Sequence, residues 1–136
     1  MASFSLGQII DAKRMISPTE EEGSTLGAID SETVDTQGAE SFATITATGT
    51  VTGAAPSVQY YESNDSPVTI EDGNKVADSN VIEERPEFAD TDNAVYVASI
   101  RPTKRYVRAR VADREDDDIH ISMVGVLGHL TERPVE

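Results

Sequence analysis

The sequence contains no cysteine and no tryptophan, and only three phenylalanines and four tyrosines occur among its 136 residues. Without cysteine there are no disulfides, no thiolate metal ligands and no thiol nucleophiles. No stretch approaches the ~18 apolar residues of a membrane span, and the first residues lack the charged and apolar segments of a signal peptide. We therefore expect no membrane partner, and a protein that stays where it is made or is carried out as part of something larger.

Positive charge is also scarce, because 25 acidic residues outnumber 11 basic ones and give a net charge of −14. A nucleic-acid-binding protein needs a dominant positive face to displace counterions, so this balance predicts no nucleic-acid partner. Hydrophobic residues make up only 38% of the chain. A single domain of this length can bury a core without disulfides, but we expect a thin core, with a partner subunit supplying part of the burial.

A period-two alternation of side chains, which is typical of half-buried strands, runs through most of the chain after residue 40. In residues 42–51 threonine recurs at every second position, with alanine, isoleucine or glycine between. Clusters of Gly, Pro, Asn and Asp separate the alternating segments. The expected strands are residues 42–51, 57–63, 68–70, 94–100, 105–111 and 119–127. This pattern predicts an all-β protein, an antiparallel β-sandwich or jelly-roll-like domain with an extended N-terminal arm.

Residues 1–30 are weakly patterned, and we expect an N-terminal arm and loop there, followed by a single β-sandwich domain at residues 31–136. Residues 1–25 hold too few apolar positions to fold alone, so they are expected to become ordered on a neighbouring subunit. The alternative is an N-terminal edge strand that lies on the domain itself. In the C-terminal strands, the residues expected to face inward are Val107, Ala109, Val111, Ile119, Ile121, Met123 and Leu127.

The sequence offers few groups for catalysis or metal binding. Neither His120 nor His129 has a partner at the spacing of a metal site, so we expect surface histidines. No Gly-rich phosphate loop and no Gly-x-Ser-x-Gly elbow occur. The acidic runs at residues 90–93 and 113–118 carry oxygen ligands of the kind Ca²⁺ prefers, but neither forms an EF-hand loop, and solvated turns are the simpler interpretation. We therefore expect no enzyme activity, no cofactor and no metal.

The basic residues are unevenly distributed, because six of the eleven lie within residues 101–114, where Asp113 is the one acid. That segment carries a charge of +5 and the rest of the chain −19. Two interpretations stay open: a docking face for an acidic surface, including that of the next copy in a repeating assembly, or a stripe that offsets the chain's own acids on neighbouring strands. The candidate interface residues are Arg101, Lys104, Arg105, Tyr106, Arg108 and Arg110.

Short segments of the chain resemble small β-rich proteins encoded among the head genes of tailed bacteriophages. Residues 34–41 (VDTQGAES) are similar to the D-T-x-G-x-E-S entry to the first long strand of those proteins. Residues 104–108 (KRYVR) match a K-R-Y-V-R strand, and residues 124–129 (VGVLGH) with 133–135 (RPV) match the last strand and its basic-Pro-Val tail. The resemblance covers residues 30–136, and the chain departs from it by lacking a tryptophan in the middle strands.

The resemblance implies a virion structural protein without catalytic residues. The expected role is that of a capsid decoration (cement) protein that binds the major capsid protein outside the shell, forms a homo-oligomer on the particle and is made in the host cytoplasm. Two alternatives stay open. One is a head–tail connector or tail component, and the other is a carbohydrate-binding or adhesion module, which would need exposed aromatic platforms built from four tyrosines.

Overall fold

In a computed structural model of the chain, the described residues are 10–21, 28–51, 57–85, 93–112 and 119–128. The strands are β1 (Ile10–Glu21), β2 (Ile29–Asp30), β3 (Val34–Asp35), β4 (Ser41–Val51), β5 (Ser57–Ser63), β6 (Val81–Arg85), β7 (Val95–Ile100), β8 (Tyr106–Ala112) and β9 (Ile119–Gly128). Two single-turn 3₁₀ helices, η1 (Asp72–Asn74) and η2 (Asp78–Asn80), precede β6. This part of the chain contains no α-helix.

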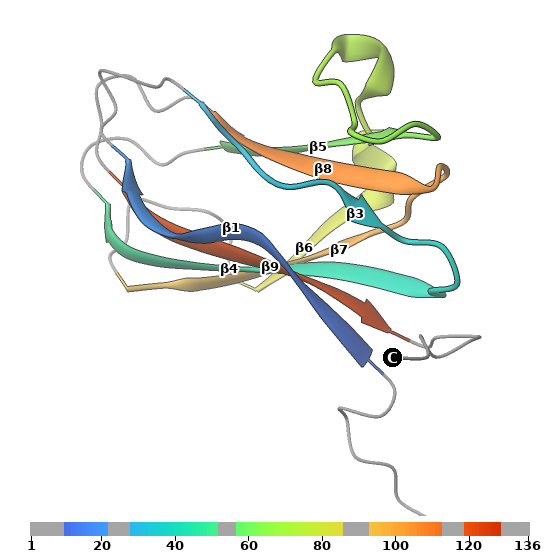
Figure 1. The fold of residues 1–136 in the computed structure, drawn as a ribbon. Helices are drawn as coiled ribbons and strands as arrows, with labels where there is room; N and C mark the ends of the chain where they lie inside the picture. The colour runs from blue at the N-terminus through green and yellow to red at the C-terminus, as the bar shows by residue number, and fades with distance from the viewer. Residues whose placement is uncertain (1–9, 22–27, 52–56, 86–92, 113–118, 129–136) are drawn as a thin grey trace, which may run out of the picture.

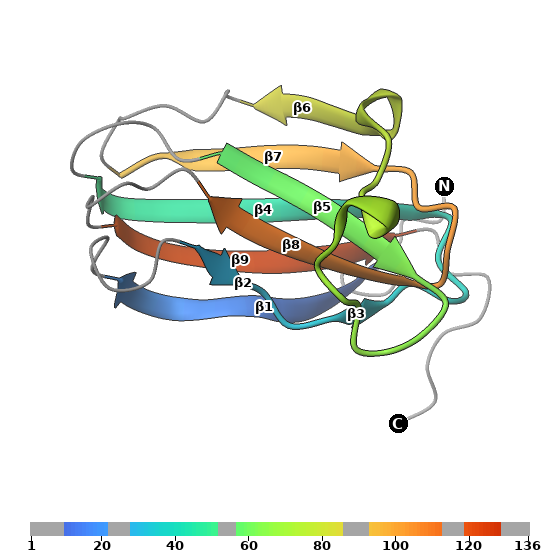
Figure 2. The ribbon, with the colours of Figure 1, turned by 90° about the horizontal axis from the view of Figure 1, so that it is seen from above.

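The strands form two antiparallel sheets that pack face to face (Figure 1). The first sheet has five strands in the order β1-β9-β4-β7-β6. In the second sheet β8 is central, with β5 along one edge and the short strands β2 and β3 along the other (Figure 2). The predicted all-β antiparallel sandwich is therefore confirmed.

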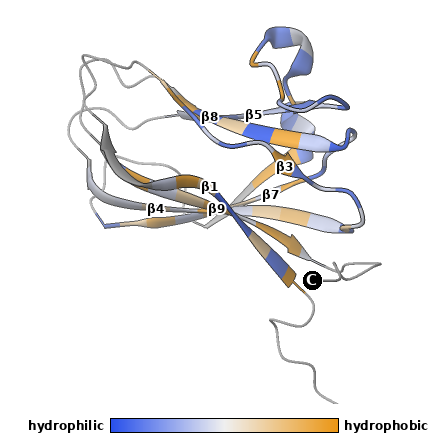
Figure 3. Cartoon of the chain, in the orientation of Figure 1, coloured by the Kyte–Doolittle hydropathy of each residue, from blue (hydrophilic) through white to orange (hydrophobic). Residues whose placement is uncertain are grey.

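Inward side chains of the two sheets form one hydrophobic core, and the apolar positions of the facing strands are visible in Figure 3. The predicted core residues that are buried are Val107, Ala109, Val111, Ile121, Met123 and Leu127. Ile119 belongs to β9, but its side chain lies outside the described part of the structure. The alternation in β8 and β9 thus assigns the two faces of both strands correctly.

The threonine face of β4 points into the sandwich. Thr44, Thr46 and Thr48 are buried, whereas Ile45 on the opposite face is 39% exposed. The Thr44 and Tyr60 hydroxyls form a hydrogen bond of 2.7 Å across the core. Burial of a hydroxyl is costly unless it is hydrogen-bonded, so this bond helps β4 to present a polar face to the core and an apolar face to the outside.

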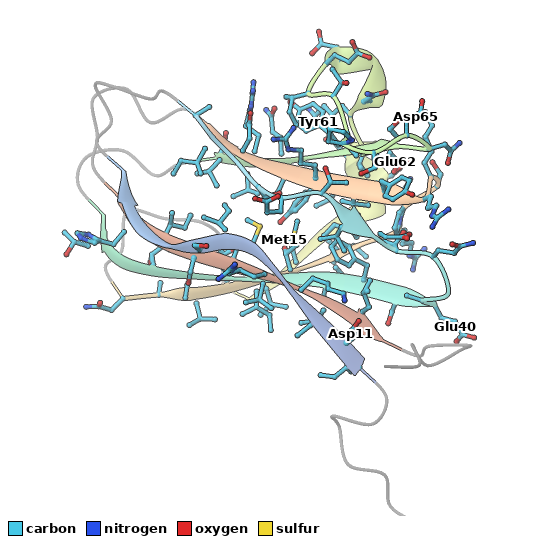
Figure 4. The ribbon with its side chains drawn as sticks, viewed as in Figure 1. Asp11, Met15, Glu40, Tyr61, Glu62 and Asp65 are labelled. Atoms are coloured by element: carbon cyan, nitrogen blue, oxygen red, sulfur yellow. The ribbon has the colours of Figure 1, made fainter. Side chains whose placement is uncertain are left out.

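The expectation of an N-terminal arm is wrong for residues 10–21, which form β1 and pair with β9 at the edge of the first sheet. Met15 and Ile16 are 1% and 6% exposed, and Met15 lies between the two sheets (Figure 4). The alternative, an edge strand on the domain itself, describes this segment, because two apolar side chains there reach the core. The sandwich therefore starts before the predicted boundary at residue 31, and residues 1–9 lie outside the described part.

Residues 68–70 do not form the short strand that their alternation predicts. Val68 is fully buried, but its N–H donates to Thr33 Oγ1 at 3.2 Å and its carbonyl accepts from Arg108 Nη1 at 3.1 Å. Side chains therefore replace the hydrogen bonds of a strand ladder. The segment between β5 and β6 lies over the outer face of the second sheet (Figures 1 and 2).

Candidate protein-binding groove

The candidate interface residues lie on β8 and on the loop between β7 and β8, and two of the arginines form ion pairs within the molecule. Arg105 Nε and Nη2 donate to the two carboxylate oxygens of Asp35 at 3.0 and 2.8 Å. Arg110 Nε and Nη2 donate to Asp30 in the same way at 2.6 and 3.0 Å. The Arg105 guanidinium also lies 4.9 Å from the centre of the half-buried Tyr106 ring.

Arg108 is held by backbone carbonyls instead of a carboxylate. Its Nε donates to the Ser31 carbonyl at 2.7 Å, and its Nη1 donates to Val68 at 3.1 Å. Arg108 thus ties the connection between β2 and β3 to the segment that covers the second sheet. The pairs that Arg105 and Arg110 form with Asp35 and Asp30 agree with the interpretation that the stripe offsets the chain's own acids. A docking role for these arginines stays a prediction.

The two ion pairs favour the charged form of both carboxylates. The hydrogen bonds from Arg110 lower the pKa of Asp30 below its ordinary value of 3.8, although partial burial opposes this shift. Arg105 lowers the pKa of Asp35 in the same way. The same hydrogen bonds raise the pKa values of Arg105 and Arg110. Because all four side chains are partly exposed to solvent, each pair contributes modestly to stability.

A groove of about 770 Å³ lies at the end of the sandwich where β4 begins and β7 ends. Its lining includes the buried side chains of Phe42 and Ile100 together with the exposed residues Arg101 and Lys104. No ion pair or side-chain hydrogen bond ties Arg101 or Lys104 to another described residue. Among the described members of the basic cluster, these two cations are therefore the ones that stay available to a partner.

The groove is locally positive in an acidic molecule. Arg105 also lines it, but Asp35 neutralises that guanidinium. Glu40 (Figure 4) is the one acid among the described residues that line the groove. Arg101 and Lys104 thus leave an excess of positive charge beside a lining that is partly apolar. An acidic surface with some apolar residues would complement this combination.

The loop that carries Arg101 and Lys104 is anchored to the rest of the fold. The carboxylate of Glu62 on β5 (Figure 4) accepts hydrogen bonds from the Thr103 N–H at 3.2 and 3.3 Å and from the Thr103 hydroxyl. The Arg101 N–H donates to the Asn80 carbonyl at 2.8 Å. A loop fixed in this way loses little conformational entropy when it binds a partner.

Glu62 is a residue that the sequence analysis missed. It is 5% exposed and lies opposite Val107 in the β5–β8 ladder, with its side chain on the inner face of a strand. The sequence did carry a signal for it: in the strand pattern of residues 57–63, Glu62 falls on the same face as the apolar residues Val58 and Tyr60. Such an acid needs hydrogen-bond donors nearby, and Thr103 supplies them.

The other predicted sites remain without structural support. In the described part of the chain, no three His, Asp or Glu side chains lie close enough to hold a metal ion. The acidic run at residues 113–118 lies outside that part, as does the run at 90–93 except for its last residue. His120 is half-buried on β9, and His129 lies outside the described residues.

Comparisons of the chain with protein-family models, with characterised proteins and with solved structures give no match. No helix in the described ranges is long and apolar enough to cross a membrane. The structure therefore defines the protein by its architecture alone. It is an antiparallel β-sandwich with a groove at one end that has polar and apolar lining residues and two exposed cations.

Proposed function

We propose that this chain is a structural binding protein of a tailed-bacteriophage head, a capsid decoration protein that binds the major capsid protein through the groove. In this role the protein performs no catalysis and uses no cofactor. It contacts neither nucleic acid nor membrane, and it acts on the outer surface of the particle after synthesis in the host cytoplasm.

The observation that carries the proposal is that the segments resembling phage head proteins meet around the groove. These segments are residues 34–41, 104–108 and 124–129. Each contributes described residues to the lining. Asp35 of the first segment pairs with Arg105 of the second, and the Glu40 N–H donates to the Gly128 carbonyl of the third at 3.2 Å. Segments far apart in the sequence thus build one structural unit, which supports a shared function for them.

The properties of the groove suit a high-copy particle component. A rigid loop with exposed cations and an apolar lining can make a contact of moderate strength with an acidic surface. Many such contacts on one particle add up by multivalency, even when each is weak. The high negative charge of the free chain keeps it soluble before assembly.

The tyrosines argue against the carbohydrate-binding alternative. All four lie in the described residues, and Tyr60, Tyr61 and Tyr96 are at most 5% exposed. Tyr106 is half-buried and lies beneath the Arg105 guanidinium. None therefore offers the open aromatic platform on which a sugar ring stacks. A head–tail connector or a tail component would use the same kind of protein contact. Only the position of the protein on the virion distinguishes these roles from decoration.

The test uses particles assembled from the major capsid protein encoded in the same genome. We expect the variant Arg101→Glu/Lys104→Glu to bind these particles about tenfold or more weakly than the wild type, because it places acids opposite an acidic partner surface. Cosedimentation gives the number of bound copies. Wild-type binding should also weaken as salt is added, since the Debye length shortens.

The matched control is Lys13→Glu/Lys75→Glu, which changes the net charge equally. Both lysines are exposed and neither lines the groove. This control should bind as the wild type does. Equal binding by both double variants would show that the groove is not the docking site, and failure of the wild type to cosediment would refute the decoration role.

A further inference from the structure

The outer face of the first sheet is apolar at its centre. Two cross-strand rows cross β9, β4 and β7 there, and we call them the apolar face. Its residues are Val124, Ile45 and Val97 in one row and Ser122, Ala47 and Val95 in the other. Ile45 and Val95 are 39% and 53% exposed, which makes them two of the three most exposed large hydrophobic residues among those described. In Figure 1 the first sheet is an outer layer, with no further described strand beyond it.

The second sheet differs, because the chain itself covers its outer face. Tyr61 lies on that side, opposite Arg108 in the ladder, yet it is only 5% exposed. The Val76 N–H donates to the Tyr60 carbonyl at 2.9 Å, and Arg108 reaches the Val68 carbonyl. One outer face of the sandwich is therefore covered by the fold, whereas no described segment covers the apolar face of the other sheet.

The charges around the molecule indicate what can cover the apolar face. None of its six residues is charged, and on the same side Arg14 of β1 lies opposite Val124 at the sheet edge. The segment over the second sheet instead exposes acids, among them Glu71, Asp72 and Asp78. Two copies with a net charge of −14 each would bring like charges together through such surfaces. Through the apolar face they can meet without burying a charge.

We propose that a second copy of this chain covers the apolar face, with the first sheets of the two copies packed against each other. A two-fold contact requires a patch that complements itself, and an uncharged patch meets this condition. One row of three branched side chains lies beside a row with two small ones and Val95, and such a surface allows two sheets to pack at the usual distance of ~10 Å. The contact goes beyond capsid binding, because the groove takes its outer-face residues from the next row, which contains Ala43, Ser99 and Val126.

The test is the mass of the purified chain in solution, measured by sedimentation velocity over a series of dilutions. We expect a dimer that dissociates on dilution, and added salt should strengthen it because salt screens the repulsion between acidic copies. This salt effect has the opposite sign to that expected for capsid binding. In Ile45→Lys/Val97→Lys the dimer should weaken by about tenfold or more, because a lysine would be buried unpaired.

A second variant, Ile45→Thr/Val95→Thr, keeps β-branched side chains on the strands, so it tests the contact if the lysine variant fails to fold. It should also shift towards monomer while its circular dichroism matches that of the wild type. The groove variant Arg101→Glu/Lys104→Glu should remain dimeric at high salt. A wild type that is monomeric at every concentration, or a threonine variant as dimeric as the wild type, would overturn this inference. If the wild type is monomeric but still binds particles, the second-copy contact is refuted and the decoration role still stands.

Discussion

Three arginines of the basic cluster, Arg105, Arg108 and Arg110, have partners within the molecule that suit their positions on the second sheet. Arg110 lies directly opposite Asp30 in the β2–β8 ladder, so their side chains meet without bending the backbone. Arg105 precedes β8 and reaches Asp35 at the end of β3. These two pairs hold the short strands β2 and β3 against β8, because those strands offer few ladder hydrogen bonds of their own.

The two ion pairs predict a specific acid response. Because the pKa values of Asp30 and Asp35 are lowered in the folded state, their contribution to stability is present above the ordinary value near 3.8 and is lost as the pH falls below it. In Asp30→Asn/Asp35→Asn this contribution should be absent. The free energy of unfolding should therefore be lower than that of the wild type at neutral pH, and should fall less steeply below about pH 4. Urea denaturation at a series of pH values measures both effects.

Asp78→Asn provides a control for the loss of an exposed carboxylate, since Asp78 contacts only Lys75 at 4.0 Å among the described ion pairs. It should have nearly the neutral-pH stability of the wild type. Parallel pH curves for the wild type and the double variant would contradict the assigned pKa shifts.

The Thr44–Tyr60 hydrogen bond yields a second prediction at this scale. Both side chains are buried and their hydroxyls lie 2.7 Å apart. Tyr60→Phe should therefore cost about 1–3 kcal/mol in unfolding free energy, since it leaves the Thr44 hydroxyl without this partner in the core. Thr44→Val in the Tyr60→Phe background should recover much of that loss. A double variant whose loss equals the sum of the single losses would show that the two hydroxyls do not interact.

At the scale of elements, β1 is as much a part of the sandwich as the strands that the sequence pattern predicts. Its ladder with β9 runs from Ile10 to Glu21, and Met15 and Ile16 are both buried. Two adjacent inward residues are possible because the register shifts between Arg14 and Ile16. β1 is the edge strand of the first sheet, and it pairs with the backbone hydrogen-bonding groups along one side of β9.

Deletion of residues 1–21 should therefore lower the thermal midpoint strongly. The truncation removes two buried side chains, each worth about 1.5–3 kcal/mol, and leaves the edge of β9 unpaired. Thermal unfolding followed by circular dichroism measures the effect. A truncation of residues 1–9 alone keeps every described strand and should melt close to the full chain. If the longer truncation also melts like the full chain, β1 does not belong to the core.

The elements that could be predicted from the sequence are mostly those with an unbroken alternation. β7, β8 and β9 have it throughout, and β4 has it up to its register shift after Thr48. β5 was predicted instead from the turn residues on either side of it. The bulges of β1 and of β6 break the period, and β2 and β3 are too short to show one. The site was predictable only in part. The basic cluster is visible in the sequence, but strand register decides that Asp30 and Asp35 neutralise two of its members. Arg101 and Lys104 therefore remain for a partner.

At the scale of the whole molecule, three kinds of surface lie on different sides of one sandwich. The groove with Arg101 and Lys104 is at one end, the apolar face with Ile45 is on the outer side of the first sheet, and exposed acids lie on the segment over the second sheet. In the proposed particle, the groove contacts the shell and the apolar face contacts a second copy. The acidic side would then face solvent, where repulsion between like charges prevents additional copies from stacking on those already bound.

The most direct test of the proposed decoration role is a cryo-electron microscopy reconstruction of phage heads assembled in cells that make this chain. The account predicts density for the sandwich at repeated positions on the outer shell. The loop with Arg101 and Lys104 should face the capsid protein. Density confined to the neck or tail would contradict decoration in favour of a connector or tail component. Heads without density for the chain would contradict its role as a head protein.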